Sequence, residues 1–303
     1  MVNGWPPSGS SWIDPVALIT MPSRPDATHP LNVVLGDGLF EALQARCRRT
    51  GEEANHVIRE ALADALDLEH HTIFQVSTAG ALVQGVYKGC VTVAELLQHG
   101  DFGLGTFDGL DGEGILLDGV CWQACSDGRV QQADARALAP FWVLVSFQAD
   151  RSSTLDDVRS WADLTARLDQ LRDQSNLFVA IRVRGVFERL SYRVACKAEA
   201  GEDLVHATDH QACFELENVA GTLVGFWTPT YARTINVPGY HLHFLSEDLR
   251  HAGHVLELQS PALTLELHCE NHLQLVLPET AEFLQADLST DPGAALAKAD
   301  GIR

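Results

Sequence analysis

The stretch at residues 238–258 reads PGYHLHFLSEDLRHAGHVLEL and predicts a β-hairpin. Side chains alternate between the two faces of a strand, so His241 and His243 would share one face while their neighbours point the other way. The segment at residues 246–253 is polar and typical of a turn, and the apolar residues after it predict a returning strand. An antiparallel sheet is therefore expected in this part of the chain.

The same hairpin would bring a third histidine, His254, beside the first pair. Three neutral imidazole nitrogens on one small patch form the ligand set of an open catalytic metal site, typically zinc, in which one position remains for water or substrate. The chain contains 13 histidines, so a pair at i, i+2 carries little weight by itself. The pair, the hairpin and the third histidine together predict a divalent metal site with His241, His243 and His254 as ligands.

The net charge of the chain is strongly negative, because 41 acidic residues outnumber 21 basic ones to give −20. A charge of this sign repels phosphate backbones and anionic membrane surfaces. We therefore expect neither nucleic acid nor a membrane as a partner of the whole molecule. An anionic small substrate would need a local positive centre, which a metal ion and an arginine could supply.

The seven cysteines are scattered and contain no Cys-x-x-Cys pair. An odd, scattered set of this kind is typical of reduced thiols in a reducing compartment. No run of 18 apolar residues occurs, and residues 1–11 lack the basic start and apolar centre of a signal peptide. These features predict a cytoplasmic protein.

With 303 residues the chain is long enough for two domains, and its pattern predicts an α/β fold of the α+β type. Residues 1–30 would be a flexible lead-in and residues 31–70 a small strand-helix-helix extension. Residues 71–152 would form an N-terminal domain with a mixed β-sheet. Residues 153–303 would form a C-terminal domain with a mostly antiparallel sheet that carries the metal site and ends in an active-site tail.

Several elements are predicted within these domains. Residues 155–174 have apolar positions at helical spacing and predict an amphipathic helix that connects the two domains. The alternating residues 273–277 predict a further strand of the C-terminal sheet. Near the N-terminal domain's glycine-rich segment, Glu113 lies between Gly112 and Gly114 at the start of an apolar strand. This is a suitable place for a carboxylate that projects into a cleft, although the same position also suits an ordinary turn residue.

The extension has a short apolar segment at residues 31–35, followed by two amphipathic helical patterns. This order, over residues 31–69, resembles the ribbon-helix-helix family of dimeric DNA-binding modules. In that family a ribbon of two paired strands enters the major groove. Here the outward position Val34 is apolar, and Glu52 and Glu53 stand at the helix N-terminus, where a phosphate would otherwise bind. We expect a dimerisation or packing extension rather than a DNA-reading module.

Seven longer stretches lie in the remaining sequence. They are TIFQVST at residues 72–78, GALVQGVY at 80–87, HGDFGLGTF at 99–107, LDGE at 110–113, VAGTLVGFWTP at 219–229, NVPGYHLHF at 236–244 and GHVL at 253–256. In this order they resemble the bacterial alpha-acetolactate decarboxylases, and the resemblance covers about residues 72–303. It implies a two-domain fold, usually a homodimer, that converts (S)-2-acetolactate to (R)-acetoin and carbon dioxide with Zn²⁺ as cofactor.

The resemblance also implies roles for individual residues. His241, His243 and His254 match the zinc ligands of the family. Glu113 and Arg193 match its active-site acid and arginine, and Thr106 lines the substrate pocket. The family brings a carboxylate from its C-terminal tail to the site, and Asp300, one methylene shorter than the usual glutamate, is the matching residue here.

Two other functions fit parts of the sequence. The spacing from His241 to Glu247 is that of the His-x-His-x-x-x-Glu motif of cupin oxygenases, which would make Glu247 a ligand and iron a plausible metal. Alternatively, the extension could be the working part of a DNA-binding regulator whose larger domain only senses a metabolite. The seven matched stretches favour the decarboxylase over both.

Overall fold

The computed structural model describes residues 32–50, 54–66, 71–172, 175–199 and 201–299. The contacts within the chain divide it into two units, residues 1–42 and 43–303. The second unit contains both β-sheets that bear on function. The predicted boundary between residues 152 and 153 falls inside this unit and stays a prediction.

The two predicted helices of the extension are confirmed. Helix α1 (Asp37–Thr50) crosses the boundary between the units, and helix α2 (Ala54–Ala65) lies in the second. Residues 32–36 have no regular secondary structure, so the predicted strand at residues 31–35 is wrong for its described part. A strand needs a partner for its backbone groups, and among the described residues none pairs with this segment. The ribbon-helix-helix resemblance therefore stays a prediction.

The first sheet of the second unit has seven strands in the order β14-β1-β8-β3-β4-β5-β6. Its strands are β1 (Thr72–Val76), β3 (Phe102–Thr106), β4 (Glu113–Leu117), β5 (Val120–Ala124), β6 (Val130–Gln132), β8 (Phe141–Val145) and β14 (His272–Val276). The β1–β14 pair is parallel and the other pairs are antiparallel, so the sheet is mixed, as predicted. Strands β3 and β8 are buried along their whole length, which means that both faces of the sheet are covered.

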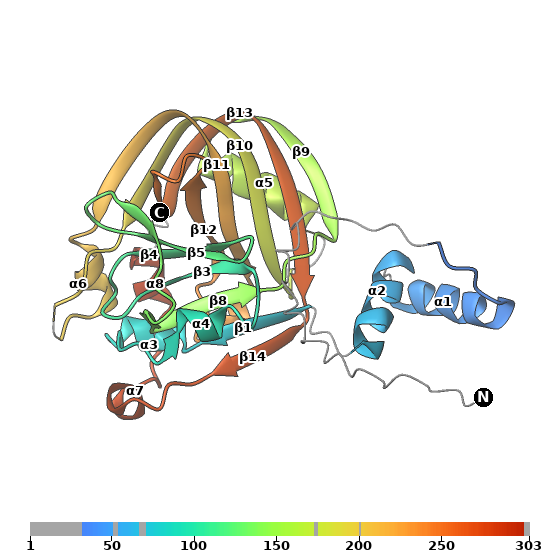
Figure 1. The fold of residues 1–303 in the computed structure, drawn as a ribbon, viewed down its shortest axis with the longest axis horizontal. Coiled ribbons are helices and arrows are strands. Elements are labelled where there is room, and N and C mark those ends of the chain that lie inside the picture. The colour runs from blue at the N-terminus through green and yellow to red at the C-terminus, as the bar shows by residue number, and fades with distance from the viewer. Residues whose placement is uncertain (1–31, 51–53, 67–70, 173–174, 200, 300–303) are drawn as a thin grey trace, which may run out of the picture. The chain divides into compact units, whose positions relative to one another are not determined.

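The second sheet has five strands and is antiparallel, as predicted. Its strands are β9 (Arg151–Val158), β10 (Phe178–Val194), β11 (Ala212–Thr228), β12 (Gly239–Ser246) and β13 (Ala252–Glu270). Strand β10 pairs with both β11 and β13, while β12 joins β11 to β13, so these four strands form a closed circuit. Figure 1 shows the long strands of this sheet arching over the seven-stranded sheet.

Short elements lie between the long strands, and two helices follow the last strand, β14. They are α3 (Ala79–Val83), β2 (Val91–Thr92), α4 (Val93–Leu96), β7 (Leu138–Ala139), α5 (Trp161–Leu171), α6 (Leu204–Thr208), the 3-10 helix η1 (Thr230–Ala232), α7 (Ala281–Gln285) and α8 (Gly293–Ala299). Several helices begin where a side chain caps the first turn. The Thr92 hydroxyl accepts a bond from the Glu95 N–H and the Glu95 carboxylate accepts one from the Thr92 N–H, which satisfies two backbone donors at once.

Two sequence predictions are wrong in detail. Strand β14 does not extend the second sheet, because β13 is already paired with β9 and β10 on either side; β14 pairs instead with β1. The predicted helix at residues 155–174 begins only at Trp161, since residues 151–158 form strand β9. Asp157 in β9 has a φ of 53°, which interrupts the alternation and buries Leu155 and Val158 three positions apart, as in a helix.

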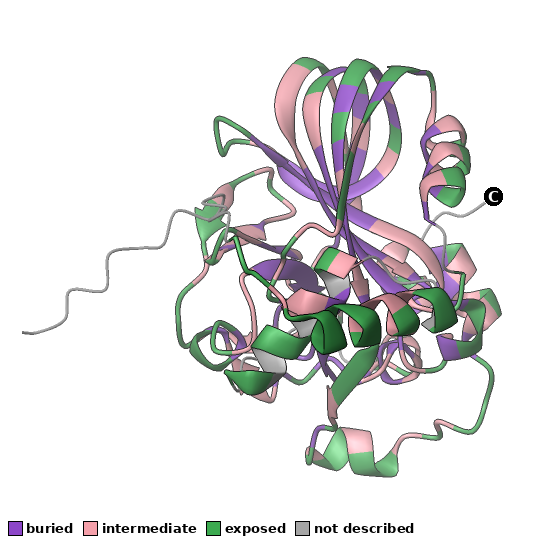
Figure 2. Ribbon diagram, turned by 90° about the vertical axis from the view of Figure 1, so that its right-hand side faces the viewer, coloured by how far each residue is buried: buried purple, intermediate pink, exposed green. Residues whose placement is uncertain are grey.

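The largest hydrophobic core lies between the two sheets. It combines residues of the first sheet, such as Phe102, with residues of the second, such as Phe226, whose rings meet edge to face at 6.3 Å. A smaller core around Trp142 and Leu144 covers the other face of the seven-stranded sheet. Figure 2 shows buried residues concentrated along the long strands. The α+β class predicted from the sequence is confirmed.

Within the described part of the chain, no helix combines the length and apolar character needed to cross a bilayer. None of the seven cysteines forms a disulfide there.

Candidate active site

The register of the second sheet brings three of the predicted site residues into one row. His243 in β12 lies directly opposite His254 in β13, and His254 lies opposite Arg193 in β10. His241 comes two residues before His243 and therefore lies on the same face of β12. The predicted hairpin is confirmed, and its pairing alone explains why residues so far apart in the sequence converge.

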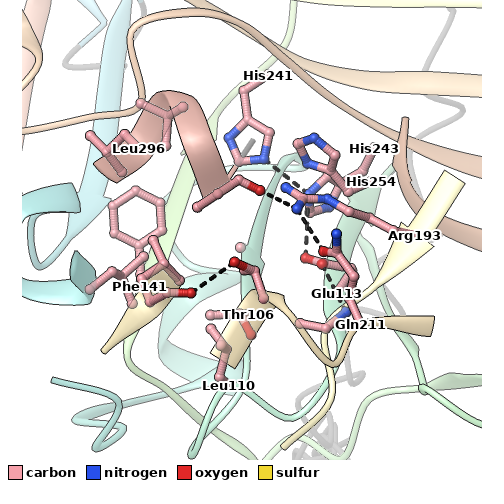
Figure 3. A pocket seen from close by; sticks show the side chains of 17 residues that line it. Thr106, Leu110, Glu113, Phe141, Arg193, Gln211, His241, His243, His254 and Leu296 are labelled. Carbon is pink, nitrogen blue, oxygen red and sulfur yellow. Dashed lines mark hydrogen bonds and ion pairs between the residues drawn. The ribbon is translucent and has the colours of Figure 1, made fainter. Parts of the chain in front are cut away.

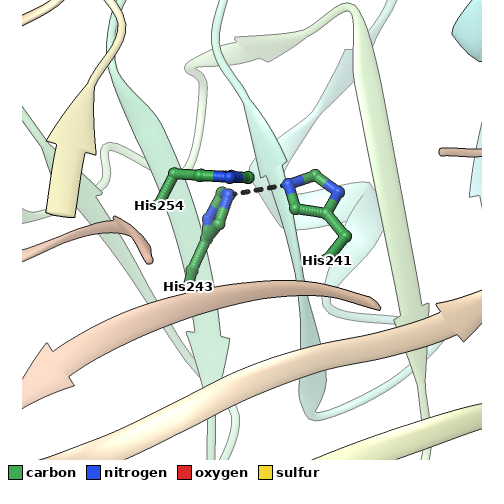
Figure 4. Close-up of side chains that lie close together, drawn as sticks. All are labelled: His241, His243 and His254. Atoms are coloured by element: carbon green, nitrogen blue, oxygen red, sulfur yellow. Dashed lines mark hydrogen bonds between the residues drawn. The ribbon is translucent and has the colours of Figure 1, made fainter. Parts of the chain in front are cut away.

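The three histidines form a compact cluster, which Figure 4 shows at close range. Each offers one ring nitrogen, and these nitrogens all lie within 4.8 Å of one another. The Nε2 atoms of His241 and His243 are 3.2 Å apart. In a tetrahedral zinc site with Zn–N bonds of about 2.0 Å, ligand nitrogens are about 3.3 Å apart, so this spacing suits a shared ion.

The environment of the cluster keeps the imidazoles of His241 and His243 neutral. Burial lowers the pKa of His243 to about 4. Burial also places the pKa of His241 well below its ordinary value, and the nearby His243 and Arg193 lower it further. A metal ion binds the neutral form of histidine. The pair is therefore ready to coordinate a cation without first losing protons at neutral pH.

Glu113 faces the cluster from the start of β4 in the seven-stranded sheet. Its Oε2 atom lies 3.5 Å from Nε2 of His243, and its Oε1 atom accepts a hydrogen bond of 3.1 Å from the Ala195 N–H. Burial raises the pKa of the Glu113 carboxyl, an effect that Arg193 and the Ala195 N–H oppose. The carboxyl group is thus held in place at the boundary between the two sheets.

Thr106 is the cross-strand partner of Glu113 in the β3–β4 pair. Its hydroxyl donates a 2.7 Å hydrogen bond to the carbonyl oxygen of Gly112, which closes the turn before β4. The Thr106 carbonyl in turn accepts a bond of 2.9 Å from the indole N–H of Trp142. Glu113 therefore follows a fixed turn, which explains how a residue between two glycines has a defined position.

Arg193 is buried, and its guanidinium donates hydrogen bonds to two neighbouring groups of the described chain. Its Nη1 atom donates a 2.6 Å hydrogen bond to Oε1 of Gln211 and another to the carbonyl oxygen of Ala299. Sequence reasoning missed Gln211, which lies in the loop between α6 and β11, where no motif or periodicity distinguishes it. Ala299 is the last residue of α8, so the chain reaches the site at that residue.

These side chains line one pocket of about 610 Å³, a volume that includes its opening to solvent. In Figure 3 the three histidines, Glu113 and Arg193 converge on one side of it. The rest of the wall is mostly apolar and includes Leu82, Leu110, Phe141, Leu204, Val237 and Leu296. A polar, potentially metal-binding end and an apolar remainder suit a small molecule with both oxygen and methyl groups.

The structure thus brings together six of the seven residues predicted for the site: Thr106, Glu113, Arg193, His241, His243 and His254. The seventh, Asp300, lies outside the described residues. Glu247 is exposed just beyond the end of β12 and does not join the histidine cluster. The cupin alternative, which needs Glu247 as a ligand, is therefore wrong.

Comparison with known proteins agrees with this geometry. Residues 73–290 match the family model described as alpha-acetolactate decarboxylase. The chain belongs to the alpha-acetolactate decarboxylase family. The match covers both sheets and the six predicted site residues that the structure describes, so the family prediction made from the motifs is confirmed.

Individual members of the alpha-acetolactate decarboxylase family are similar over most of their length. The protein of that name from Methanosarcina mazei is 38% identical over 241 residues, which cover 79% of this chain and 84% of the relative. The one from Methylococcus capsulatus is 37% identical over 246 residues, or 81% and 95% of the two chains. The crystal structure of alpha-acetolactate decarboxylase from Bacillus subtilis strain 168 matches with a TM-score of 0.73 at 35% identity, over 76% of this chain and 98% of that chain.

Proposed function

We propose that this protein is an acetolactate decarboxylase that converts (S)-2-acetolactate to (R)-acetoin and carbon dioxide. The observation that carries the proposal is the pocket in which three histidines face an acid and an arginine from other strands, in a member of this family. The reaction takes up one proton and releases one carbon dioxide. The site must therefore hold a carboxylate, accept charge on a ketone oxygen and supply a proton.

The proposed cofactor is Zn²⁺, held by His241, His243 and His254. Three imidazole nitrogens with one position left for substrate are the usual arrangement of catalytic zinc. The spacing of the ring nitrogens and the low pKa of His243 fit this ion. When bound, the ion supplies the positive charge that offsets the charge developing on the ketone oxygen as the carbon–carbon bond breaks.

Arg193 is proposed to bind the substrate carboxylate. A guanidinium can form two parallel hydrogen bonds with a carboxylate, which orients as well as attracts it. Gln211 and the Ala299 carbonyl hold the arginine from one side, so its position does not depend on the substrate. The carboxylate would then leave as carbon dioxide from a fixed place in the pocket.

Glu113 is proposed to deliver the proton. Loss of carbon dioxide leaves an electron pair that is shared between the former C2 carbon and the ketone, and protonation at that carbon gives acetoin. The Ala195 N–H fixes the Glu113 carboxyl on one side of the pocket, so the proposed proton transfer would reach this carbon from one face. Delivery from one face makes a single enantiomer, and water then restores the proton to the carboxyl.

The apolar wall is proposed to exclude water and to hold the two methyl groups of the substrate. Thr106 forms part of this wall and fixes the turn that presents Glu113. The approach of α8 to Arg193 supports a contribution from the tail of the chain. We therefore keep Asp300, which follows Ala299 in the sequence, as a proposed third catalytic residue.

The protein is further proposed to act as a homodimer in the cytoplasm, with 2-acetolactate as its small-molecule substrate. The dimer comes from the family resemblance, and the location comes from the composition of the sequence. Size-exclusion chromatography with light scattering tests the dimer, because a monomeric mass at micromolar concentration would contradict it.

The test of the activity is acetoin formation from synthetic acetolactate. We expect the purified protein to form acetoin, to lose this activity after treatment with a chelator and to regain it with zinc. Chiral chromatography should show a single acetoin enantiomer. If the zinc-loaded protein leaves acetolactate unchanged, the proposed function is wrong.

A further inference from the structure

A second cluster of metal-binding side chains lies away from the pocket. It consists of His71, His268 and Glu270, whose candidate ligand atoms all lie within 4.8 Å of one another. All three residues are buried, with 4%, 1% and 1% of the residue surface exposed. His268 and Glu270 are near the end of β13, whereas the pocket histidine His254 is near its start, so the two clusters are separate.

The hydrogen bonds of His71 direct one of its nitrogens toward the cluster. Its Nδ1 atom lies 2.6 Å from the carbonyl oxygen of Cys269. A carbonyl can only accept, so Nδ1 carries the proton and the lone pair of a neutral His71 is on Nε2. Histidines that bind metals commonly donate their other ring N–H to a backbone carbonyl in this way.

The contact between His268 and Glu270 also favours a cation. Nδ1 of His268 lies 3.0 Å from Oε1 of Glu270 and accepts a long bond of 3.4 Å from the Gln148 N–H. The contact with Glu270 is the closer of the two, so either a proton or a bound cation lies between this nitrogen and the carboxylate. A buried carboxylate needs a positive charge beside it, which a protonated His268 or a metal ion supplies.

The backbone of His71 is strained in a way that maintains the cluster. Its φ is 53°, a conformation that costs a non-glycine residue energy and that the surrounding structure must stabilise. The N–H groups of Asn271 and His272 both donate to the His71 carbonyl, at 3.1 and 3.0 Å. The strain therefore occurs at the point where the chain enters β1 beside β14.

We propose that His71, His268 and Glu270 form a second, structural site for a divalent cation of the zinc type. Two nitrogens and one carboxylate oxygen are suitable zinc ligands, and complete burial is typical of a structural site. The site would join the start of β1, in the seven-stranded sheet, to the end of β13, in the five-stranded sheet. Its role is to tie the two sheets together, independently of the reaction in the pocket.

The main competitor is a proton on His268, which would make the pair a buried ion pair without metal. The zinc content of the protein distinguishes a metal site from a metal-free ion pair. The protein is made in zinc-supplemented medium without a histidine tag, passed through chelator-treated buffer and analysed for zinc by mass spectrometry. We expect about two zinc ions per folded chain, and about one in E270Q, because an amide is a poor replacement for a carboxylate ligand.

Two further variants control the result. H272N changes an exposed histidine next to the cluster and should keep both ions. H243A should lose the pocket ion and keep the second, so it decides the question even if E270Q does not fold. One zinc ion in the wild-type chain and none in folded H243A would overturn the proposal, as would two ions in folded E270Q.

The second site can fail independently of the proposed function. If E270Q loses one zinc ion and still forms acetoin, the result supports both the second metal site and the proposed decarboxylase activity. A wild-type chain with one zinc ion and full activity overturns only the second site. An inactive chain with two zinc ions, one of them lost in E270Q, supports the second site and overturns only the function.

Discussion

The Nδ1 atom of His243 lies 3.0 Å from the carbonyl oxygen of Gly114, a residue 129 positions away in the chain. The carbonyl can only accept, so Nδ1 carries the proton and Nε2 presents its lone pair to the other two histidines. The five-stranded sheet thus carries the proposed ligand His243, while the seven-stranded sheet sets the orientation of its ring. Outer-shell bonds of this kind typically change metal affinity by about 10–100-fold when they are lost.

Substitution of Gly114 by alanine should disturb this bond. An added Cβ would lie 2.2 Å from Cζ2 of Trp142, so β4 must shift away from the indole. We expect G114A to lose about 1–3 kcal/mol of unfolding free energy, as for other overpacked cores, and to bind zinc more weakly. Denaturant unfolding and zinc titration measure the two effects. G38A, where an added Cβ meets no atom within 4 Å, is the control and should lower neither, because alanine is the better helix former.

Removal of a proposed zinc ligand should abolish activity. In H254A, two nitrogens remain at the site, and we expect zinc affinity to fall by more than about 100-fold, the upper end for an outer-shell loss. Metal analysis and acetoin formation measure the result. His251 lies on the same hairpin but outside the cluster, so H251A should keep both metal and activity. Equal zinc affinity in the two variants would contradict the proposed ligand set.

Replacement of Glu113 by glutamine should separate chemistry from metal binding. The amide keeps the size of the side chain and cannot donate the proton, so we expect kcat to fall by about 10²–10⁴-fold with the zinc content unchanged. Any acetoin that still forms should have lower enantiomeric purity, because water would supply the proton. D111N, a change two residues earlier, should retain normal kcat. A normal kcat in E113Q would exclude Glu113 as the proton donor.

Gln211 is a positioning residue for Arg193, which is proposed to bind the substrate carboxylate. Loss of Gln211 should therefore weaken substrate binding. A hydrogen bond to a charged group contributes about 1.5–3 kcal/mol, so Q211A should raise KM by roughly 10–100-fold with a smaller change in kcat. Q131A removes an exposed glutamine and should leave KM unchanged. In a double-mutant cycle with R193K the effects should be non-additive. Strict additivity would show that Gln211 does not act through the arginine.

The cysteines should differ strongly in reactivity. Burial raises the pKa of the Cys121 thiol to about 12, so only about one part in 10⁴ is thiolate at pH 8. Cys213 is exposed. We expect iodoacetamide at pH 8 to modify Cys213 in the folded protein and to modify Cys121 only after denaturation, as measured by peptide mass spectrometry. Equal rates at the two positions in folded protein would contradict the described core around Cys121.

The sequence was most informative where local pattern determines structure. Alternation around His241 and His243 predicted the hairpin, and the hairpin register then placed His254 opposite His243. The site residues that sequence reasoning missed are set by tertiary contacts. Gln211 reaches Arg193 from a loop without any repeating pattern. Ala299 contributes its backbone carbonyl, which every residue type has, so the sequence does not mark this position.

The errors in the fold have physical causes of the same kind. The left-handed backbone of Asp157 gives a strand the burial spacing of a helix, and a single sequence does not reveal that conformation. The strand at residues 272–276 has the right pattern but no local signal for its partner. Its place beside β1 depends on which edges remain after the longer strands have paired.

The pocket wall draws on residues from Leu82 to Ala299, and α8 supplies Leu296 to it. During translation the ribosome must therefore release the chain as far as α8 before the wall can close. A nascent chain halted before α8 could already contain all three histidines, yet it would lack the final part of the enclosure. Catalytic competence should consequently arise late in biosynthesis, after most of the sheet framework has emerged.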